Sequence, residues 1–288
     1  MEQHETKTLR LNDGNSMPRI GMGFYQVPEG EDCETSLKTG LQMGYRLIDT
    51  AAAYQNERSI GKAIRESGVK REEIFLTTKL WVQDYGFENA KRSIDGALKR
   101  LGLEYVDLLL LHRPAGDAIG AYRALEAAKK EGKIRSIGVC NHTTPQLTAL
   151  MRETSVVPAV NQVECHPLQQ QLKLRRELER HGIVLESWFP LGHGSKRLRL
   201  NETLGAIAEK HGKSLSQVIL RWHLQEGFVV IPKSSNPGHM RENLDLFSFR
   251  LSDGDMAAIR ALHADRYLGG DPEDPEKMKE WEQLRFEF

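Results

Sequence analysis

Residues 87–112 read FENAKRSIDGALKRLGLEYVDLLLLH and contain the unit that decides the fold. Within 87–101, apolar residues recur every three or four positions, as on one face of an amphipathic helix. Gly102 follows at a position where a helix ends easily in the left-handed conformation. Val106–Leu111 is then an almost continuous apolar run, typical of a parallel strand covered on both faces. This stretch therefore predicts a helix, a glycine stop and a buried parallel strand.

The same unit recurs on both sides of this stretch. Each further helix is followed by a glycine or by a short apolar strand, and the predicted helices are 32–43, 57–67, 120–131, 145–152, 169–181 and 202–211. The further strands are predicted at 47–49, 74–78, 134–139, 160–163, 183–186 and 228–231. Alternation of strands and helices implies a parallel sheet, and about eight strands favour closure into a (β/α)₈ TIM barrel.

Two segments lie outside this repeat. Residues 7–22 carry the turn residues Asp13 and Gly14 and predict a β-hairpin ahead of the barrel. The tail after residue 264 is rich in Gly, Pro and charge, and its apolar pattern over Met278–Phe288 predicts a short packed helix. No low-complexity linker interrupts the chain, so residues 1–288 are expected to form one domain.

The composition narrows the class of protein. Lys+Arg and Asp+Glu number 40 each, and this zero net charge disfavours a nucleic-acid or anionic-membrane binder. The three cysteines, Cys33, Cys140 and Cys165, form no CxxC pair, which favours a reducing compartment without disulfides. Met1–Arg10 lacks an apolar signal peptide, and no run is long enough to span a bilayer, so we expect a cytoplasmic protein.

Four ionisable residues lie at or just after the ends of three successive predicted strands: Asp49 and Tyr54, Lys79, and His112. Catalytic groups of such barrels gather at the carboxyl ends of the strands. A lysine ammonium would stabilise a tyrosine phenolate, an aspartate would orient the lysine, and a histidine would hold a substrate oxygen. Any one of these residues alone would more often be a cap, a solvated charge or a rim residue. Together they predict a site where Tyr54 acts as a general acid.

Several long motifs now point to one family. GYRLIDTAAAYQNERSIGKAI (44–64) resembles the first signature of the aldo-keto reductase superfamily, and bacterial 2,5-diketo-gluconate reductases are similar. Five further blocks resemble the family in the same order, and they are LTTKLW (76–81), LGLEYVDLLLLHRP (101–114), GKIRSIGVCN (132–141), PAVNQVECHP (158–167) and VIPKSSNP (230–237). The resemblance covers nearly all of residues 7–262 and implies a (β/α)₈ barrel that binds NADPH and reduces small carbonyl compounds.

The resemblance also implies roles for individual residues. The catalytic tetrad would be Asp49, Tyr54, Lys79 and His112, with Tyr54 as the proton donor. The residues expected to bind the cofactor are Asn141, Gln162, Trp188, Pro190, Leu191, Gly192, Lys233, Ser234, Ser235, Asn236, His239, Glu242 and Asn243. Lys233, beside hydroxyl groups at the start of a helix, is also a natural phosphate site because helix N-termini attract anions.

Two residues depart from the family pattern at the cofactor site. Cys140 stands where a serine is usual, which would weaken a hydrogen bond to the nicotinamide carboxamide. His239 stands where an arginine usually pairs with the 2′-phosphate, and a neutral histidine offers no permanent charge. Arg241 is expected to face another side of the helix. NADPH is therefore expected to bind more tightly than NADH, but with a smaller difference in affinity than in family members that carry the arginine.

The substrate pocket is expected to include Tyr25, Trp81, His112 and Arg113. Arg113 follows the predicted catalytic histidine directly, and it would bind either a substrate carboxylate or a carboxylate of a nearby loop. The family resemblance implies that the tail closes over the pocket, where Tyr267 and Leu268 would add an apolar contact. The alternative is that the tail only packs on the outer helices through Trp281 and Phe286 and adds stability. Glu164, Cys165 and His166 are interpreted as residues at the end of a strand, and no metal site is predicted.

Two alternatives to a reductase remain open from the sequence. A binding or structural protein on the same barrel would keep the fold without turnover. A lyase or aldolase would use Lys79 as a Schiff base, which the neighbouring Asp49 opposes by keeping the amine protonated. No association motif is present, so a monomer is expected, with a small carbonyl compound as its partner and no nucleic acid or membrane.

Overall fold

The computed structural model describes residues 6–288. The first five residues, which belong to the segment Met1–Arg10 and to the expected domain 1–288, lie outside this range. Within the described residues, no helix is long and apolar enough to cross a membrane.

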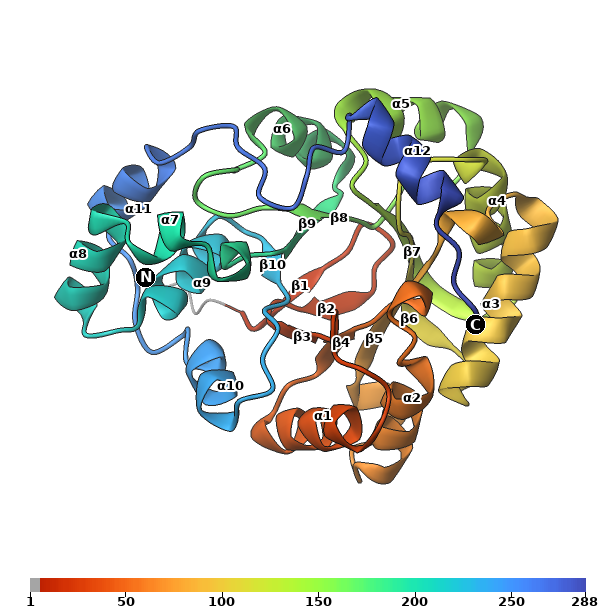
Figure 1. Cartoon of the computed structure of the whole chain (residues 1–288), viewed down its shortest axis with the longest axis horizontal. Helices are drawn as coiled ribbons and strands as arrows, with labels where there is room; N and C mark the ends of the chain where they lie inside the picture. Colours follow the sequence, from red (N-terminus) through yellow and green to blue (C-terminus); the bar gives the residue numbers. More distant parts are fainter. Residues whose placement is uncertain (1–5) are drawn as a thin grey trace.

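Eight strands form one parallel sheet in the order β10-β9-β8-β7-β6-β5-β4-β3. Their bounds are Gly21–Gly23 (β3), Leu47–Asp49 (β4), Phe75–Leu80 (β5), Val106–Leu111 (β6), Ile134–Cys140 (β7), Val160–Glu164 (β8), Val184–Trp188 (β9) and Val229–Val230 (β10). A parallel bridge between Ile20 and Val230 joins the two ends of the sheet. The strands therefore close into a barrel with helices around it, as predicted (Figure 1).

Helices follow most strands at the predicted places. Their bounds are Glu31–Met43 (α1), Glu57–Glu66 (α2), Phe87–Leu101 (α3), Ala118–Lys130 (α4), Thr144–Glu153 (α5), Leu172–His181 (α6), Lys196–Arg199 (α7), Glu202–His211 (α8), Leu215–Gln225 (α9), Pro237–Leu244 (α10), Asp253–Arg260 (α11) and Pro275–Gln283 (α12). Helix α6 begins three residues later than predicted, because Gln171 has a left-handed backbone (φ 54°) that interrupts a helix.

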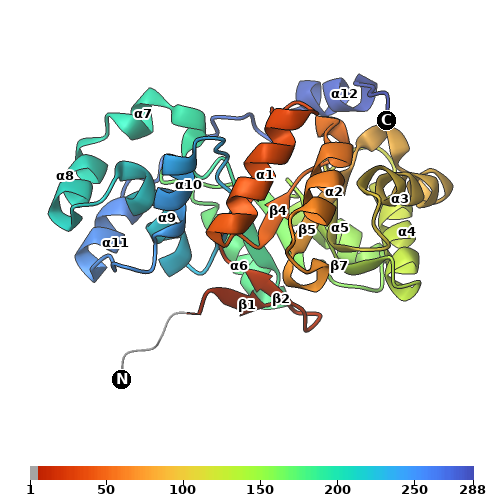
Figure 2. The same ribbon diagram turned by 90° about the horizontal axis from the view of Figure 1, so that it is seen from below.

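The N-terminal hairpin is shorter than the predicted 7–22. It consists of β1 (Thr8–Arg10) and β2 (Ser16–Pro18), and residues 21–22 belong to barrel strand β3 instead. Leu11 and Met17 of the hairpin are buried against residues inside the barrel. Figure 2 shows the hairpin at one end of the barrel and α12 at the other. The hairpin thus seals one end and leaves the other for a site.

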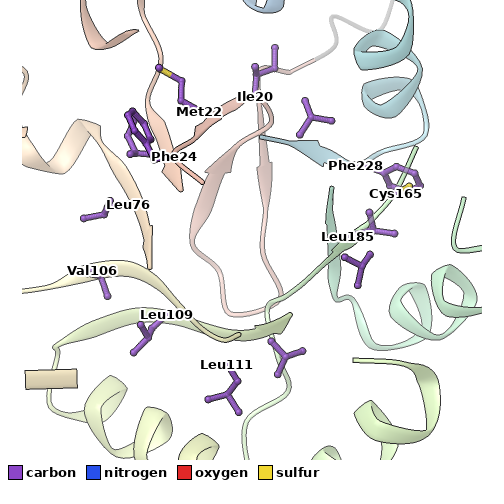
Figure 3. Close-up of a cluster of buried hydrophobic side chains, with 14 of the residues drawn as sticks. Ile20, Met22, Phe24, Leu76, Val106, Leu109, Leu111, Cys165, Leu185 and Phe228 are labelled. Carbon is purple, nitrogen blue, oxygen red and sulfur yellow. The ribbon is translucent and has the colours of Figure 1, made fainter. Parts of the chain in front are cut away.

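The apolar side chains of each strand alternate between two layers, one against the helices and one inside the barrel. Leu109 and Leu111 of β6 pack with the helices in the larger cluster, several members of which Figure 3 shows around the strands. Leu108 and Leu110 belong to a second cluster with Phe75 of β5. Successive side chains of a strand point to opposite faces, so this second cluster fills the barrel interior.

The contact between α2 and α3 depends on Gly61. A Cβ atom at this position would lie 1.8 Å from the carbonyl oxygen of Leu101, which is backbone and cannot rotate away. Gly61→Ala is therefore expected to lower the free energy of unfolding by about 2–3 kcal/mol through overpacking. Gly205→Ala in α8 is the control, because no atom lies within 4 Å of its added Cβ. Helix propensity should stabilise that variant by about 0.5–1 kcal/mol. Urea denaturation measures both, and equal stabilities would contradict this packing.

Candidate active site

The strand alternation that fills the barrel also places polar residues at its open end. Leu47 and Phe75 point into the barrel, and Asp49 and Lys79 lie two and four residues further along the same strands. His112 follows the inward residue Leu110 by two positions. Because side chains two residues apart share a face, these polar groups project into the same space.

Lys79 joins the expected catalytic residues through hydrogen bonds. Its side chain is fully buried, and its Nζ donates to Asp49 Oδ1 at 2.6 Å and to the Tyr54 hydroxyl at 3.3 Å. A third bond at 3.0 Å reaches the carbonyl oxygen of Thr50. The ring of Tyr54, from a short 3₁₀ helix after β4, meets the ring of His112 edge-on at 5.6 Å. The structure therefore brings all four residues of the predicted set together.

Burial and charge set the protonation of this group. Burial would lower the pKa of Lys79, but the adjacent Asp49 carboxylate outweighs it and holds that pKa above its usual value. Burial also raises the pKa of Tyr54 to about 12, although Lys79 acts in the opposite direction. Lys79 stabilises the phenolate as expected from the sequence, but desolvation has the larger effect on the pKa of Tyr54. Burial, with Lys79 and Arg113, holds the pKa of His112 well below its usual value.

A cavity of about 660 Å³ opens above these groups. It is lined by twelve residues of the predicted site, which are Tyr25, Asp49, Tyr54, Trp81, His112, Arg113, Asn141, Gln162, Trp188, Pro190, Leu191 and Lys233. Lys79 lies behind Tyr54 and does not line the cavity. The other predicted cofactor residues lie off its wall, on the loop after β9 and around α10, and they are Gly192, Ser234, Ser235, Asn236, His239, Glu242 and Asn243.

Gln162 connects two buried carboxyl groups inside the barrel. Its Nε2 donates to Asp49 Oδ2 at 2.7 Å and to Glu186 Oε2 at 2.8 Å. Among residues 6–288, its Oε1 accepts a hydrogen bond only from the Cys140 thiol, at 3.9 Å, and so keeps a lone pair available at the cavity wall. Sequence reasoning missed Glu186, although it precedes Trp188 by two positions and must share its face.

Glu186 predicts an unusual pH dependence of stability. Its Oε1 is buried without a partner, and burial with the nearby Asp49 raises its pKa to about 8. The folded state therefore keeps a proton that the unfolded state, with a pKa of about 4.3, releases. Stability is lost as pH rises through this window. Glu186→Gln, which cannot ionise, should gain about 1–3 kcal/mol of unfolding free energy at about pH 9 and little at about pH 4.

Urea denaturation at both pH values measures this gain. Glu57→Gln is the matched control, because the carboxylate of the buried Glu57 pairs with Arg100 at 2.7 Å. Removing that charge leaves Arg100 unpaired and should destabilise the protein. Identical pH profiles of the unmodified protein and Glu186→Gln would show that Glu186 does not titrate as described.

Asn141 and Trp188 orient each other at the cavity wall. The indole Nε1 of Trp188 donates to Asn141 Oδ1 at 2.9 Å, and Asn141 Nδ2 donates to the carbonyl oxygen of His112 at 3.2 Å. Asn141 has a left-handed backbone with φ 58°, a conformation that asparagine tolerates better than most residues. These bonds fix the plane of the indole at the cavity wall.

The sequence of residues 19–264 matches the Aldo/keto reductase family. This chain belongs to that family. An aldo-keto reductase of Mycolicibacterium smegmatis is 47% identical over 92% of this chain and 96% of that protein. Glyoxal reductase of Bacillus subtilis is 46% identical over 93% and 96%. A crystal structure of a Gox0644 mutant in complex with NADPH has a TM-score of 0.86 and 41% identity, and covers 93% of this chain and 97% of its own.

The start of α10 in this aldo/keto reductase is already capped. Asn236 Oδ1 accepts the backbone N–H groups of Gly238 and His239 at 2.8 and 3.1 Å. The Ser234 hydroxyl accepts the N–H of Asn236 at 3.1 Å. The exposed Lys233 is the permanent cation on this loop ahead of α10, and His239 is exposed as well.

The tail of the aldo/keto reductase reaches the cavity through its last helix. Trp81 Nε1 donates to the carbonyl oxygen of Leu284 at 3.1 Å, and the ring of Phe286 meets that of Trp81 at 5.3 Å. Trp281, Leu284 and Phe286 line the cavity. Tyr267 and Leu268, which were expected to form this contact, do not line it. The tail thus closes the pocket through α12 and the residues after it.

Glu164 holds the earlier part of the tail. Its carboxylate accepts the backbone N–H groups of Leu268 and Gly269, the latter at 2.9 Å, and lies 3.0 Å from His166 Nε2. Gly269 packs so closely on Trp188 that a Cβ would lie 2.7 Å from the indole. Glu164 therefore has a structural partner, and residues 6–288 contain no acidic, cysteine or histidine group arranged for a metal.

Proposed function

We propose that this aldo/keto reductase is an NADPH-dependent reductase of aldehydes and ketones. The observation that carries the proposal is Lys79, whose buried ammonium bonds both Asp49 and the Tyr54 hydroxyl at the wall of the cavity. The reaction consumes one carbonyl compound, one NADPH and one proton, and yields one alcohol and one NADP⁺.

The cavity wall fits a nicotinamide with its carboxamide. Gln162 keeps a free acceptor, Trp188 presents an oriented indole face, and Asn141 lies between them. When bound, NADPH supplies a hydride, which carries two electrons and one proton to the carbonyl carbon. Lys233 lies beside the start of α10 and would meet a phosphate group.

The remaining cofactor contacts are proposed from the family resemblance. Pro190, Leu191 and Gly192 would follow the pyrophosphate. Ser234, Ser235 and Asn236 would surround the 2′-phosphate, with His239 beside the adenine. Glu242 and Asn243 of α10 would bind the adenine edge.

Two side chains act on the carbonyl oxygen. Tyr54, protonated at neutral pH because its pKa is raised, donates its phenolic proton to that oxygen. Lys79 stabilises the phenolate that remains, and Asp49 keeps the lysine charged. No ring nitrogen of His112 bonds to another residue among those described, so its neutral imidazole is available to donate a hydrogen bond.

The structure disfavours the Schiff-base alternative. Lys79 is fully buried, bonds three oxygen atoms and does not line the cavity. A Schiff base requires an unprotonated amine that reaches the substrate, whereas Asp49 holds the pKa of this amine high. The silent-barrel alternative is disfavoured because the four residues keep a connected geometry.

We also place the protein in the cytoplasm as a single-domain monomer. Cys33, Cys140 and Cys165 are free and buried, which favours a reducing compartment. Every residue of the proposed site lies within one chain, so the reaction needs no partner subunit.

The test is NADPH oxidation with a panel of aldehydes, oxo acids, diketones and quinones. We expect turnover of at least one aldehyde, with an alcohol formed for each NADPH consumed. NADPH binding without turnover across the panel would favour the silent barrel. Trapping of a carbonyl substrate on Lys79 by borohydride would favour the Schiff-base enzyme.

His239 predicts a narrow preference for NADPH over NADH. An arginine at this exposed position would add a permanent charge near Lys233, so His239→Arg should tighten NADPH about tenfold and NADH little. Dissociation constants of both cofactors, measured by fluorescence titration, test this. Arg241→Lys controls for a change on the same helix without a change of charge. Tighter binding of NADH than NADPH by the unmodified protein would show that this loop binds no 2′-phosphate.

A further inference from the structure

Arg113 stands at the mouth of the cavity directly after His112. Its backbone is held by Tyr85, whose hydroxyl donates to the Arg113 carbonyl oxygen at 3.0 Å and accepts its N–H at 3.1 Å. The side chain lines the cavity, and its guanidinium lies over the ring of Trp281 at 4.4 Å. Both ends of the residue are thus positioned by aromatic neighbours.

The guanidinium has no anionic partner in the described chain. Its Nε is buried without a hydrogen bond, and residues 6–288 offer it no ion pair. Arg100 and Arg71 also have one buried nitrogen each without a partner, but they pair with the carboxylates of Glu57 and Asp107, each at 2.7 Å. A buried N–H group without an acceptor is costly, so this arrangement favours an anion supplied by a ligand.

Carboxylates on the segments around Arg113 make other contacts, and none of the described residues forms the ion pair with a loop considered from the sequence. Asp117 caps α4 by accepting the Gly120 N–H at 2.8 Å. Glu282 accepts the Gly116 N–H at 3.0 Å. Glu280 lines the cavity but pairs with Lys277 at 2.7 Å.

We propose that Arg113 binds the carboxylate of the substrate, and that the preferred substrates are oxo acids, aldehydes or ketones that carry a carboxylate. This inference rests on the proposed reductase function. Arg113 and His112 are neighbours in sequence, and the rings of His112 and Tyr54 meet at 5.6 Å. All three residues line the same cavity, so a short molecule with its carbonyl oxygen at Tyr54 and His112 can reach Arg113 with its other end. The planar guanidinium matches a carboxylate through two parallel hydrogen bonds.

Succinic semialdehyde and its methyl ester provide the test, because they differ chiefly in the carboxylate charge. The unmodified protein should show a higher kcat/KM for the acid than for the ester. Arg113→Met should lower the ratio of the two kcat/KM values by about 10- to 100-fold, since a charge-assisted pair is lost. Arg113→Lys, which keeps the positive charge, should retain part of the preference for the acid over the ester. Arg123→Met, an exposed arginine on α4 that pairs with Glu153, changes the net charge equally and should leave the ratio unchanged.

A binding measurement separates this inference from the proposed function. Calorimetry of the NADP⁺-loaded full chain with butanoate, which has no carbonyl to reduce, should show binding that Arg113→Met abolishes. If neither aldehyde is reduced but butanoate binds through Arg113, the reductase proposal fails and the carboxylate site stands. If the ester is reduced as well as the acid, or if butanoate binds Arg113→Met equally, the carboxylate proposal is overturned. Melting temperatures of both Arg113 variants show whether they are folded.

Discussion

Replacing Tyr54 with phenylalanine is expected to slow carbonyl reduction by about 100- to 10,000-fold, the range of general acid catalysis. The change removes one hydroxyl, which accepts a hydrogen bond from Lys79 at 3.3 Å, and leaves the ring against His112. Lys79 keeps its bonds to Asp49 and Thr50, so the fold and the NADPH affinity should be maintained. Steady-state kinetics and a cofactor titration on the same variant measure both effects.

Tyr122→Phe is the control for loss of a buried tyrosine hydroxyl. Tyr122 is fully buried in α4, its hydroxyl has no partner among the described residues, and it does not line the cavity. Its removal should leave turnover within about twofold, because a buried unpaired group contributes little to a distant site. A Tyr54→Phe variant that retained more than about a tenth of the activity would contradict the proton-donor role.

Lys79→Met is expected to produce the second large effect, and here stability changes as well as activity. The substitution leaves Asp49 buried beside Glu186 without its cation, at a cost of about 3–5 kcal/mol in unfolding free energy. Burial already holds the pKa of Asp49 above its usual value, and loss of the ammonium raises this pKa further. The loss of unfolding free energy in Lys79→Met should therefore become smaller as pH falls, and it should be largest at neutral pH and above.

The double variant Asp49→Asn, Lys79→Met separates charge from packing. Removing both charges should recover a large part of the lost stability, because no buried charge remains unpaired. Activity should stay low, since no ammonium is left to stabilise the tyrosine phenolate. Denaturant unfolding of the three proteins across pH tests this, and a loss below about 1 kcal/mol in Lys79→Met would argue against a buried ion pair.

The sequence predicts the barrel well because local signals repeat. Apolar runs such as Val106–Leu111 and glycine stops such as Gly102 define most strands and helices to within a few residues. The boundary between hairpin and barrel is less clear, because Gly21 and Gly23 of β3 carry no side chain that would show a strand pattern. The late start of α6 depends on the left-handed conformation of Gln171, which the neighbouring sequence does not predict.

The site is predicted in part for a related reason. Residues at or just after strand ends, such as Asp49 and His112, can be recognised because they are polar residues next to apolar runs. Glu186 is harder to recognise from the sequence. It is found only by noting that Glu186 and Trp188, two residues apart on one strand, must share a face. The tail contacts of Trp281 and the missing partner of Arg113 arise between segments distant in sequence, and only the folded chain shows them.

The most direct measurement follows the hydride itself. NADPH carrying deuterium at the transferring position is supplied to the unmodified enzyme with an aldehyde, and the alcohol is examined by mass spectrometry and NMR. Direct hydride transfer predicts one deuterium on the carbinol carbon of every alcohol formed. Alcohol without deuterium, or NADPH bound and never oxidised, would contradict the assignment of this barrel as a carbonyl reductase.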